Sequence, residues 1–241
     1  MSDAPVTAAQ APSKAPDRIA GMFDAIAPRY DLLNHVLSAG IDRRWRDRAL
    51  RALRLTGDET LLDVCTGTAD VALQARGASR VIGVDFAAEM LSVGQRKLLV
   101  SEEHQRITLI RGDATRLPVR DGTADAATVA FGIRNVEHPE RACGELARAL
   151  RSGGRLVILE FGVPRVPGIR TLYLWYFKYL LPFIGRIVSG HNAAYSYLPA
   201  SVGTFPPPRE FVAMLERAGF AEVRADPLTF GIAYLYTATK P

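Results

Sequence analysis

The chain has 241 residues, enough for one α/β domain with a large core and short for two domains. Its 30 lysines and arginines against 25 aspartates and glutamates give a net charge of +5, a mildly basic and mixed balance that excludes a polybasic nucleic-acid-binding tail. The two cysteines, Cys65 and Cys143, fall in a predicted strand and a predicted helix, which argues against a disulfide framework and fits a reducing, cytoplasmic setting.

The N-terminal region is predicted to contain a leader followed by helices. Residues 1–16 are rich in alanine and proline and lack the apolar core of a signal peptide, so we expect a disordered leader before a single domain over residues 17–241. Apolar residues at helical spacing follow from Ile19 onward. A second predicted helix, which includes Trp45 and Leu53, is basic around the rest of its circumference. Both a solvated face and a contact with anionic lipid are open for it.

Short apolar runs that alternate with helical segments predict a parallel sheet. Five runs read as strands, at residues 60–65, 80–85, 107–111, 124–131 and 155–161. Helical crossovers between buried apolar strands are typical of a doubly wound α/β fold. After a helix over 211–218, two further strands over 222–229 and 232–239 are linked so closely that only an antiparallel hairpin is allowed. This order predicts the Rossmann-like, seven-stranded sheet of S-adenosylmethionine-dependent methyltransferases.

The turn after the first predicted strand, residues 63–70, has the chemistry of a cofactor site. Gly67 lets the backbone pass close to a ligand, while Thr68 offers a hydroxyl and Asp63 a carboxylate. The turn lacks the three glycines of the dinucleotide fingerprint, which argues against NAD, and its acidic groups suit the ammonium of a methionine-derived ligand. The alternative is an ordinary turn in which glycine serves packing.

Acidic residues also follow the second and third predicted strands. Asp85 can accept hydrogen bonds from both hydroxyls of a ribose, or it can cap the helix that starts at Ala87. Asp113 is placed to accept from an adenine amino group while the backbone of Ala114 donates to a ring nitrogen. Together with Asp63, these strand ends predict an adenosyl ligand.

A cation and an amide, Arg134 and Asn135, come just beyond the fourth predicted strand. Residues past the carboxyl end of a strand face the ligand crevice of an open α/β sheet. Both side chains can donate hydrogen bonds to a substrate oxygen, and arginine remains protonated, which makes it a poor general base. The structural alternative for Arg134 is a salt bridge to Glu137 or Glu160.

An aromatic insertion is expected at about residues 165–207. Lys178 and Pro182 interrupt its most aromatic stretch, 172–184, so this stretch is not a membrane span. It could cover the active site and accept a prenyl tail, or rest in the lipid interface through its aromatic rings. Ordinary core or dimer packing is the third interpretation.

Several motifs together resemble the C-methyltransferases of ubiquinone and menaquinone biosynthesis. They are residues 63–70, 112–114, 131–136 and 148–161, preceded by an N-terminal signature at 30–34 with Ser38 and Trp45. Two positions depart from the family pattern. Asp42 stands where histidine is usual, which puts proton transfer at that position in doubt, and Ala69 stands where a third glycine is frequent.

The resemblance implies transfer of a methyl group from S-adenosylmethionine to a ring carbon of a prenylated quinol. The residues of the cofactor turn, 63–70, favour demethylmenaquinol as this quinol. It places the cofactor on Gly67, Thr68, Asp85, Asp113 and Ala114 and catalysis on Arg134 and Asn135, with no metal. The equivalent ubiquinone-pathway reaction and a non-catalytic adenosyl-binding subunit of a quinone-synthesis assembly are the alternatives. The general base is open among Asp31, Asp42, His138, His191 and water.

The expected partners follow from this substrate. A lipophilic quinol implies a cytoplasmic protein with peripheral contact at the inner face of the membrane, and the aromatic insertion leaves a homodimer open. No nucleic-acid partner is expected.

Overall fold

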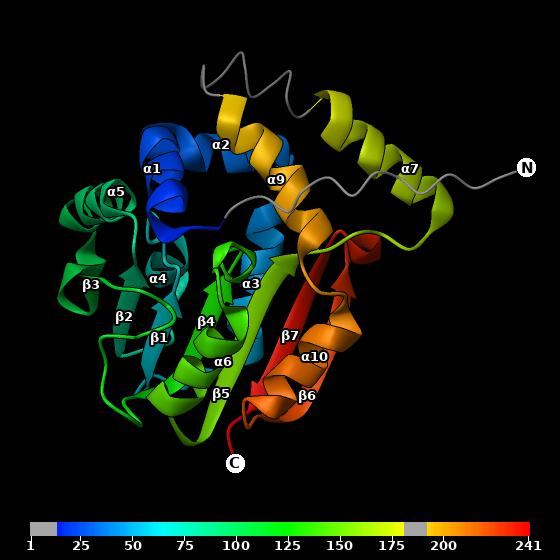
Figure 1. Ribbon diagram of the computed structural model, residues 1–241. Helices are drawn as coiled ribbons and strands as arrows, with labels where there is room; N and C mark the ends of the chain where they lie inside the picture. The colour runs from blue at the N-terminus through cyan, green and yellow to red at the C-terminus, as the bar shows by residue number, and fades with distance from the viewer. Residues whose placement is uncertain (1–13, 181–191) are drawn as a thin grey trace, which may run out of the picture.

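The structure is a computed structural model that describes residues 14–180 and 192–241, so residues 1–13 of the expected leader lie outside the described residues. One sheet of seven strands has the order β3-β2-β1-β4-β5-β7-β6 (Figure 1). Its strands are β1 Thr60–Val64, β2 Arg80–Asp85, β3 Ile107–Arg111, β4 Ala124–Ala130, β5 Leu150–Phe161, β6 Ala221–Leu228 and β7 Ala233–Thr239.

The strand directions confirm the predicted doubly wound sheet. Strands β1 to β5 run parallel, and β7 runs antiparallel to both β5 and β6. Strands β1 and β4 are neighbours although β2 and β3 separate them in the sequence, so the chain order reverses between them. Ligand crevices of open α/β sheets form at such a switch point, outside the carboxyl ends of the strands.

Helices cover both faces because the strands are apolar on both faces. In β1, Leu61 and Leu62 are fully buried on opposite sides of the sheet, as strand alternation requires, and Val157 and Ile158 repeat this in β5. One core is covered by α3 Ile41–Leu53, α4 Asp70–Gln74 and α5 Ala88–Leu99, and the other by α6 Pro139–Ala149 and α10 Pro208–Arg217.

Further helices gather beyond the carboxyl ends of the parallel strands (Figure 1). They are α1 Pro16–Ile26, α2 Tyr30–Leu37, α7 Pro167–Trp175 and α9 Asn192–Thr204, with the 3₁₀ turn Ala27–Arg29 and the π-helix Tyr176–Leu180. The predicted N-terminal helix stops near Pro28, since proline lacks the N–H that a continuous helix needs. The sequence did not predict α2 as a helix of its own.

Strand β5 differs most from its predicted range, whereas the ends of the other strands agree to within one residue. It begins at Leu150 and not at Arg155, and its register against β4 shifts between Ala124 and Ala126. Gly153, with a φ of 76°, lies within this irregular stretch.

In the aromatic insertion, residues 181–191, including the end of the aromatic stretch and His191, lie outside the described residues. Within residues 14–180 and 192–241, no helix combines the length and apolar character that crossing a membrane requires.

Candidate active site

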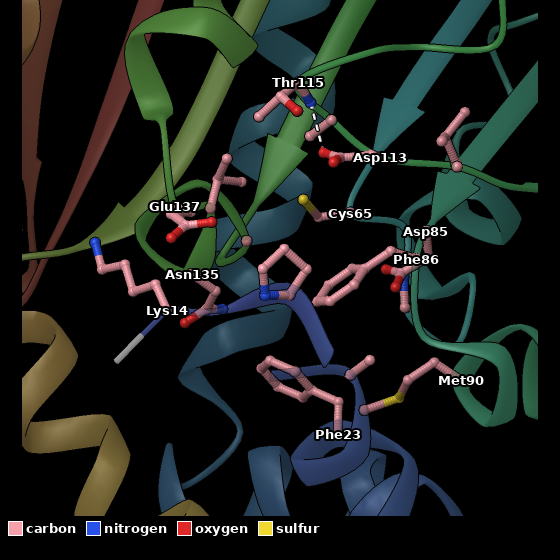
Figure 2. Close-up of a pocket in the computed structure, with 18 of the residues that line it drawn as sticks. Lys14, Phe23, Cys65, Asp85, Phe86, Met90, Asp113, Thr115, Asn135 and Glu137 are labelled. Carbon is pink, nitrogen blue, oxygen red and sulfur yellow. Dashed lines mark hydrogen bonds between the residues drawn. The ribbon is translucent and has the colours of Figure 1, made fainter. Parts of the chain in front are cut away.

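A cavity of about 350 Å³ lies at the switch point between β1 and β4 (Figure 2). The carboxyl ends of the four strands β1 to β4 form its walls, and α1 closes one side. Four of the predicted cofactor residues line it, namely Gly67, Asp85, Asp113 and Ala114. The volume falls within the range of about 300–1,000 Å³ that is usual for small-molecule sites.

The carboxylate of Asp85 ties two parts of this wall together. Its Oδ2 accepts the backbone N–H of Gly67 at 2.8 Å, and its Oδ1 accepts that of Ala87 at 2.9 Å. The bond from Ala87 is the helix cap that the sequence left open as an alternative. The bond from Gly67 fixes the glycine turn. Burial raises the pKa of Asp85 to about 6. Since each carboxylate oxygen can accept more than one hydrogen bond, Asp85 can still hold ribose hydroxyls.

Asp113 and Asn135 add further acceptors to the wall of this cavity (Figure 2). The side chain of Asp113 accepts a hydrogen bond from the N–H of Thr115 at 2.8 Å. This bond closes a turn that places Ala114 in the cavity wall. The Oδ1 atom of Asn135 is buried and has no hydrogen-bond partner among the described residues. A buried acceptor of this kind is normally satisfied by a ligand or water.

Two residues of the predicted cofactor turn face away from the cavity. The hydroxyl of Thr68 donates to Asp31 at 2.5 Å, and Asp63 accepts from Thr66 at 2.6 Å. Neither Thr68 nor Asp63 lines the cavity. The sequence located the turn but not the directions of its side chains, because several of its residues have positive φ values that break strand alternation. Burial raises the pKa of Asp63 to about 7.

A second cavity, of about 450 Å³, adjoins the first. Apolar side chains of α1, α2, α7 and the start of α3 make up most of its wall. Phe23, Tyr30 and Phe131 line both cavities, so the two meet at these rings. No sequence pattern indicates this junction, since aromatic residues in helices and at strand ends are equally typical of core packing.

Arg134 lines the second cavity and Asn135 the first, because the 3₁₀ turn Ile133–Asn135 turns them apart. Arg134 donates to the fully buried Glu160 at 2.8 Å and to the carbonyl of Phe131 at 2.5 Å. The salt bridge weighed as a structural alternative is therefore present. The Nε atom of Arg134 is buried without a partner in the described chain, which leaves it a donor for a ligand. The two side chains that were expected to act on one substrate therefore face different cavities.

The candidate bases are spread over the site. Asp31 forms an ion pair with Lys97 at 2.6 Å, and His138 is half-exposed on the rim of the first cavity. Asp42 lines the second cavity. Burial alone would raise the pKa of Asp42, but hydrogen bonding from Ser38 and the charge of Arg46 bring it below the ordinary value. His191 lies outside the described residues.

The sheet, the cavity at its switch point and the adjoining apolar cavity define the class of protein, an S-adenosylmethionine-dependent methyltransferase. The residues present fit this cofactor. The carboxylates of Asp85 and Asp113 can accept hydrogen bonds from the ribose hydroxyls and the adenine amino group of the cofactor. The unpaired Oδ1 of Asn135 can accept one from the ammonium of its methionine part.

The chain belongs to the ubiE/COQ5 methyltransferase family, since the sequence model of that family matches residues 12–240. It is 46% identical over 228 residues to the ubiquinone/menaquinone biosynthesis C-methyltransferase UbiE of a Geobacter species, covering 93% of this chain and 97% of that one. It is also 46% identical over 224 residues to the demethylmenaquinone methyltransferase of Thermus thermophilus, covering 91% of this chain and all of the relative. Among solved structures, the [4+2]-cyclase SpnF has a TM-score of 0.70 at 18% identity, covering 96% of this chain and 98% of that chain.

These comparisons confirm the family, the fold class and the methyltransferase activity expected from the sequence. The structural likeness to a cyclase, at low identity, bears on the fold alone. The individual site residues rest on the geometry described above.

Proposed function

We propose that this protein methylates a ring carbon of demethylmenaquinol to give menaquinol, with S-adenosylmethionine as the methyl donor. The observation that supports this best is the apolar cavity that meets the cofactor cavity at Phe23, Tyr30 and Phe131. A prenylated aromatic ring needs an apolar site that opens onto the methyl donor. The relatives named for demethylmenaquinone and for ubiquinone/menaquinone C-methylation point to the same substrate class.

The residues of the first cavity hold the cofactor, which when bound supplies an electrophilic methyl group. Asp85 accepts the ribose hydroxyls, and Asp113 with the Ala114 backbone holds the adenine. We reassign Asn135 from the substrate to the cofactor, since its unpaired Oδ1 faces the first cavity. Thr68 supports the Gly67 turn from behind through its bond to Asp31.

Arg134 acts on the substrate from the second cavity. A quinol ring carbon becomes nucleophilic as the neighbouring hydroxyl loses its proton, and the resulting oxyanion needs a fixed donor. The Nε–H of Arg134 is such a donor, held in place by Glu160. One well-placed donor to an oxyanion contributes about 3–4 kcal/mol to lowering a barrier of this kind. Alignment of the ring with the methyl group contributes further.

We also propose that the mouth of the second cavity rests on the inner face of the membrane, where a prenylated quinol resides. Leu172, Trp175 and Tyr179 share one side of α7 and its continuation, and all three are more than half exposed. Leu172 and Trp175 also line the cavity. Residues 161–209 contain no aspartate or glutamate and five lysines or arginines, a charge that complements anionic lipid.

Methyl-labelled S-adenosylmethionine and three acceptors test the reaction: demethylmenaquinol, the unmethylated prenylated benzoquinol of the ubiquinone pathway, and an unprenylated naphthoquinol. We expect label on the ring carbon of demethylmenaquinol, with the highest kcat/KM of the three. Preference for the benzoquinol would move the protein to the ubiquinone pathway. Cofactor binding without methylation of any acceptor would overturn the reaction and favour a non-catalytic subunit.

A further inference from the structure

A chain of hydrogen-bonded side chains, which we call the exit network, joins the wall of the second cavity to the protein surface. It consists of Ser38, Asp42 and His35. The hydroxyl of Ser38 donates to Oδ1 of Asp42 at 2.6 Å, and Nδ1 of His35 lies 3.1 Å from Oδ2 of Asp42. Ser38 and Asp42 line the cavity, whereas the His35 side chain is 28% exposed and is not part of the wall. The network therefore runs from the cavity outward.

Ser38 lies on the cavity wall, where the lone pairs of its hydroxyl oxygen are available to a bound quinol. A hydroxyl has one proton and two lone pairs. Because the proton of Ser38 points to Asp42, its oxygen can accept a hydrogen bond from a hydroxyl group in the cavity. The phenolic hydroxyl of a quinol is such a group, and its proton must leave for the ring to accept a methyl group.

The central member is held as an anion. The side chain of Asp42 is 4% exposed, and Arg46 donates to its Oδ2 at 2.6 Å. Burial alone would raise its pKa, but the bonds from Ser38 and His35 and the charge of Arg46 lower it. Asp42 is therefore too weak a base to keep the proton, although it can pass one on.

Asp42 belongs to a set of linked ion pairs that has one more carboxylate than cations. Arg46 lies 2.6 Å from Asp42 and 3.5 Å from Asp70, and Lys97 lies 2.6 Å from both Asp70 and Asp31. Three carboxylates thus face two cations. A proton that reaches Asp42 therefore enters a set of groups whose excess negative charge favours its arrival.

The outer member opens to solvent. The Nε of exposed Arg43 donates to Nε2 of His35 at 3.3 Å, a contact that water screens. An imidazole accepts and releases protons near neutral pH more readily than other side chains. His35 thus supplies the step that a buried carboxylate cannot, the release of the proton to water.

We propose that Ser38, Asp42 and His35 form a proton relay that carries the quinol hydroxyl proton from the second cavity to solvent, an inference that rests on the proposed function. The quinol O–H bond breaks as its proton bonds to Ser38, whose own proton moves to Asp42. In the structure the His35 ring donates from Nδ1 to Asp42 and accepts from Arg43 at Nε2. Proton exchange with water at the exposed ring produces the tautomer protonated at Nε2, to which Arg43 no longer donates. Nδ1 of that tautomer takes the proton from Oδ1 of Asp42, 3.3 Å away, and the Nε2 proton then leaves to water.

The electrons balance within the proposed reaction. The electron pair left on the quinol oxygen shifts into the ring, whose carbon bonds to the methyl group as the carbon–sulfur bond breaks. The ring hydrogen then leaves as a proton, the quinol oxygen is protonated again, and one proton is released for each methyl group transferred. Arg134 and the exit network thus act on the same oxygen, Arg134 by holding its charge and the network by removing its proton.

The variant His35→Asn tests the relay. Asparagine can still donate to Asp42 but cannot carry a proton, so kcat on demethylmenaquinol should fall about 100-fold, as for other lost acid–base groups. KM and the cofactor Kd should stay within about twofold, since His35 lies on neither cavity wall. Added imidazole should restore part of kcat, which it would not do for a residue with only a structural role. His104→Asn, an exposed histidine at the opposite edge of the sheet, is the matched control and should match the wild type.

A second variant, at the central residue of the network, tests the relay independently of His35. Asp42→Asn leaves Arg46 with Asp70 as an ionic partner, and its kcat should fall at least as far without rescue by imidazole. Wild-type kcat in His35→Asn, or a loss that imidazole does not relieve, would overturn the relay while leaving methyl transfer intact. A wild type that methylates no quinol would overturn the proposed function, and the relay with it.

Discussion

Arg134 and Asn135 are adjacent in the chain, yet each faces a different cavity. Arg134 is 6% exposed and pairs with Glu160, which has no exposed surface. A buried ion pair of this kind contributes little net stability, but removing one partner leaves an uncompensated charge. Glu160 therefore fixes a cation whose free Nε remains available to the substrate.

Replacing Arg134 with methionine should affect stability and catalysis together. We expect the free energy of unfolding in urea to fall by about 3–5 kcal/mol, because Glu160 is left buried without its partner. The kcat should fall at least about 100-fold through loss of the oxyanion donor. The double variant Arg134→Met/Glu160→Gln should recover most of the stability and none of the activity. Recovery of activity in the double variant would contradict the catalytic role.

Asp63 makes the stability of the protein depend on pH. Burial raises its folded-state pKa to about 7, above the ordinary value of 3.8, so folding favours the protonated form and the stability it contributes is lost as pH rises through 7. Between pH 5 and pH 8, the wild type should lose about 2–3 kcal/mol relative to Asp63→Asn, which cannot ionise. Urea unfolding of both proteins at the two pH values measures this difference. A constant difference would show that Asp63 is ionised throughout.

Secondary-structure elements meet most closely where β1 and β4 end. Cys65 follows β1 with a φ of 57°, and a Cβ atom added to Gly132 after β4 would lie 2.2 Å from the Cβ of Cys65. These two turns, which both line the first cavity, can therefore touch only if one of them has no side chain.

This contact predicts a pair of compensating substitutions. Gly132→Ala should lower the free energy of unfolding by about 1–3 kcal/mol, because the new methyl group forces the two turns apart. Cys65→Gly removes the facing Cβ and suits the positive φ at that position, so the double variant should regain most of the loss. Urea denaturation of the single and double variants measures this. Equal destabilisation in both would contradict the steric explanation.

The molecule as a whole places α1, α2, α7 and α9 beyond the carboxyl ends of the parallel strands, away from the C-terminus (Figure 1). Most of the residues that line the two cavities come from these helices and strand ends. The proposed membrane contact would place this end of the molecule on the membrane and leave the amino ends of the parallel strands in water. On that proposal a lipid-soluble quinol enters the second cavity without crossing the aqueous phase.

A negative charge introduced beside the second cavity tests this orientation. Tyr179→Glu alters an exposed ring that does not line the cavity, and should reduce binding to vesicles with anionic lipid about tenfold in co-sedimentation. The kcat/KM for quinol embedded in vesicles should fall in parallel, while that for a short-chain quinol in solution should not. Val100→Glu, an exposed apolar residue at the end of α5, is the matched control. Equal vesicle binding by both variants would contradict the proposed face.

The sequence by itself determined the five parallel strands, the antiparallel hairpin, the family and four residues that line the first cavity, Gly67, Asp85, Asp113 and Ala114. Apolar runs, glycines and strand-end carboxylates are local features, and the rule that ligands meet the carboxyl ends of parallel strands converts them into a site. The predicted turn and crevice could be located in this way without any knowledge of side-chain direction.

Only the tertiary structure decided where individual side chains point and which of them meet. It turned Thr68 and Asp63 inward, divided Arg134 from Asn135, and joined Ser38, Asp42 and His35 into one network. The physical reason is that positive φ values and short 3₁₀ turns break the periodicity on which sequence inference depends. Contacts between helices such as α1, α2 and α7 also arise from packing over long chain separations, which no local pattern records.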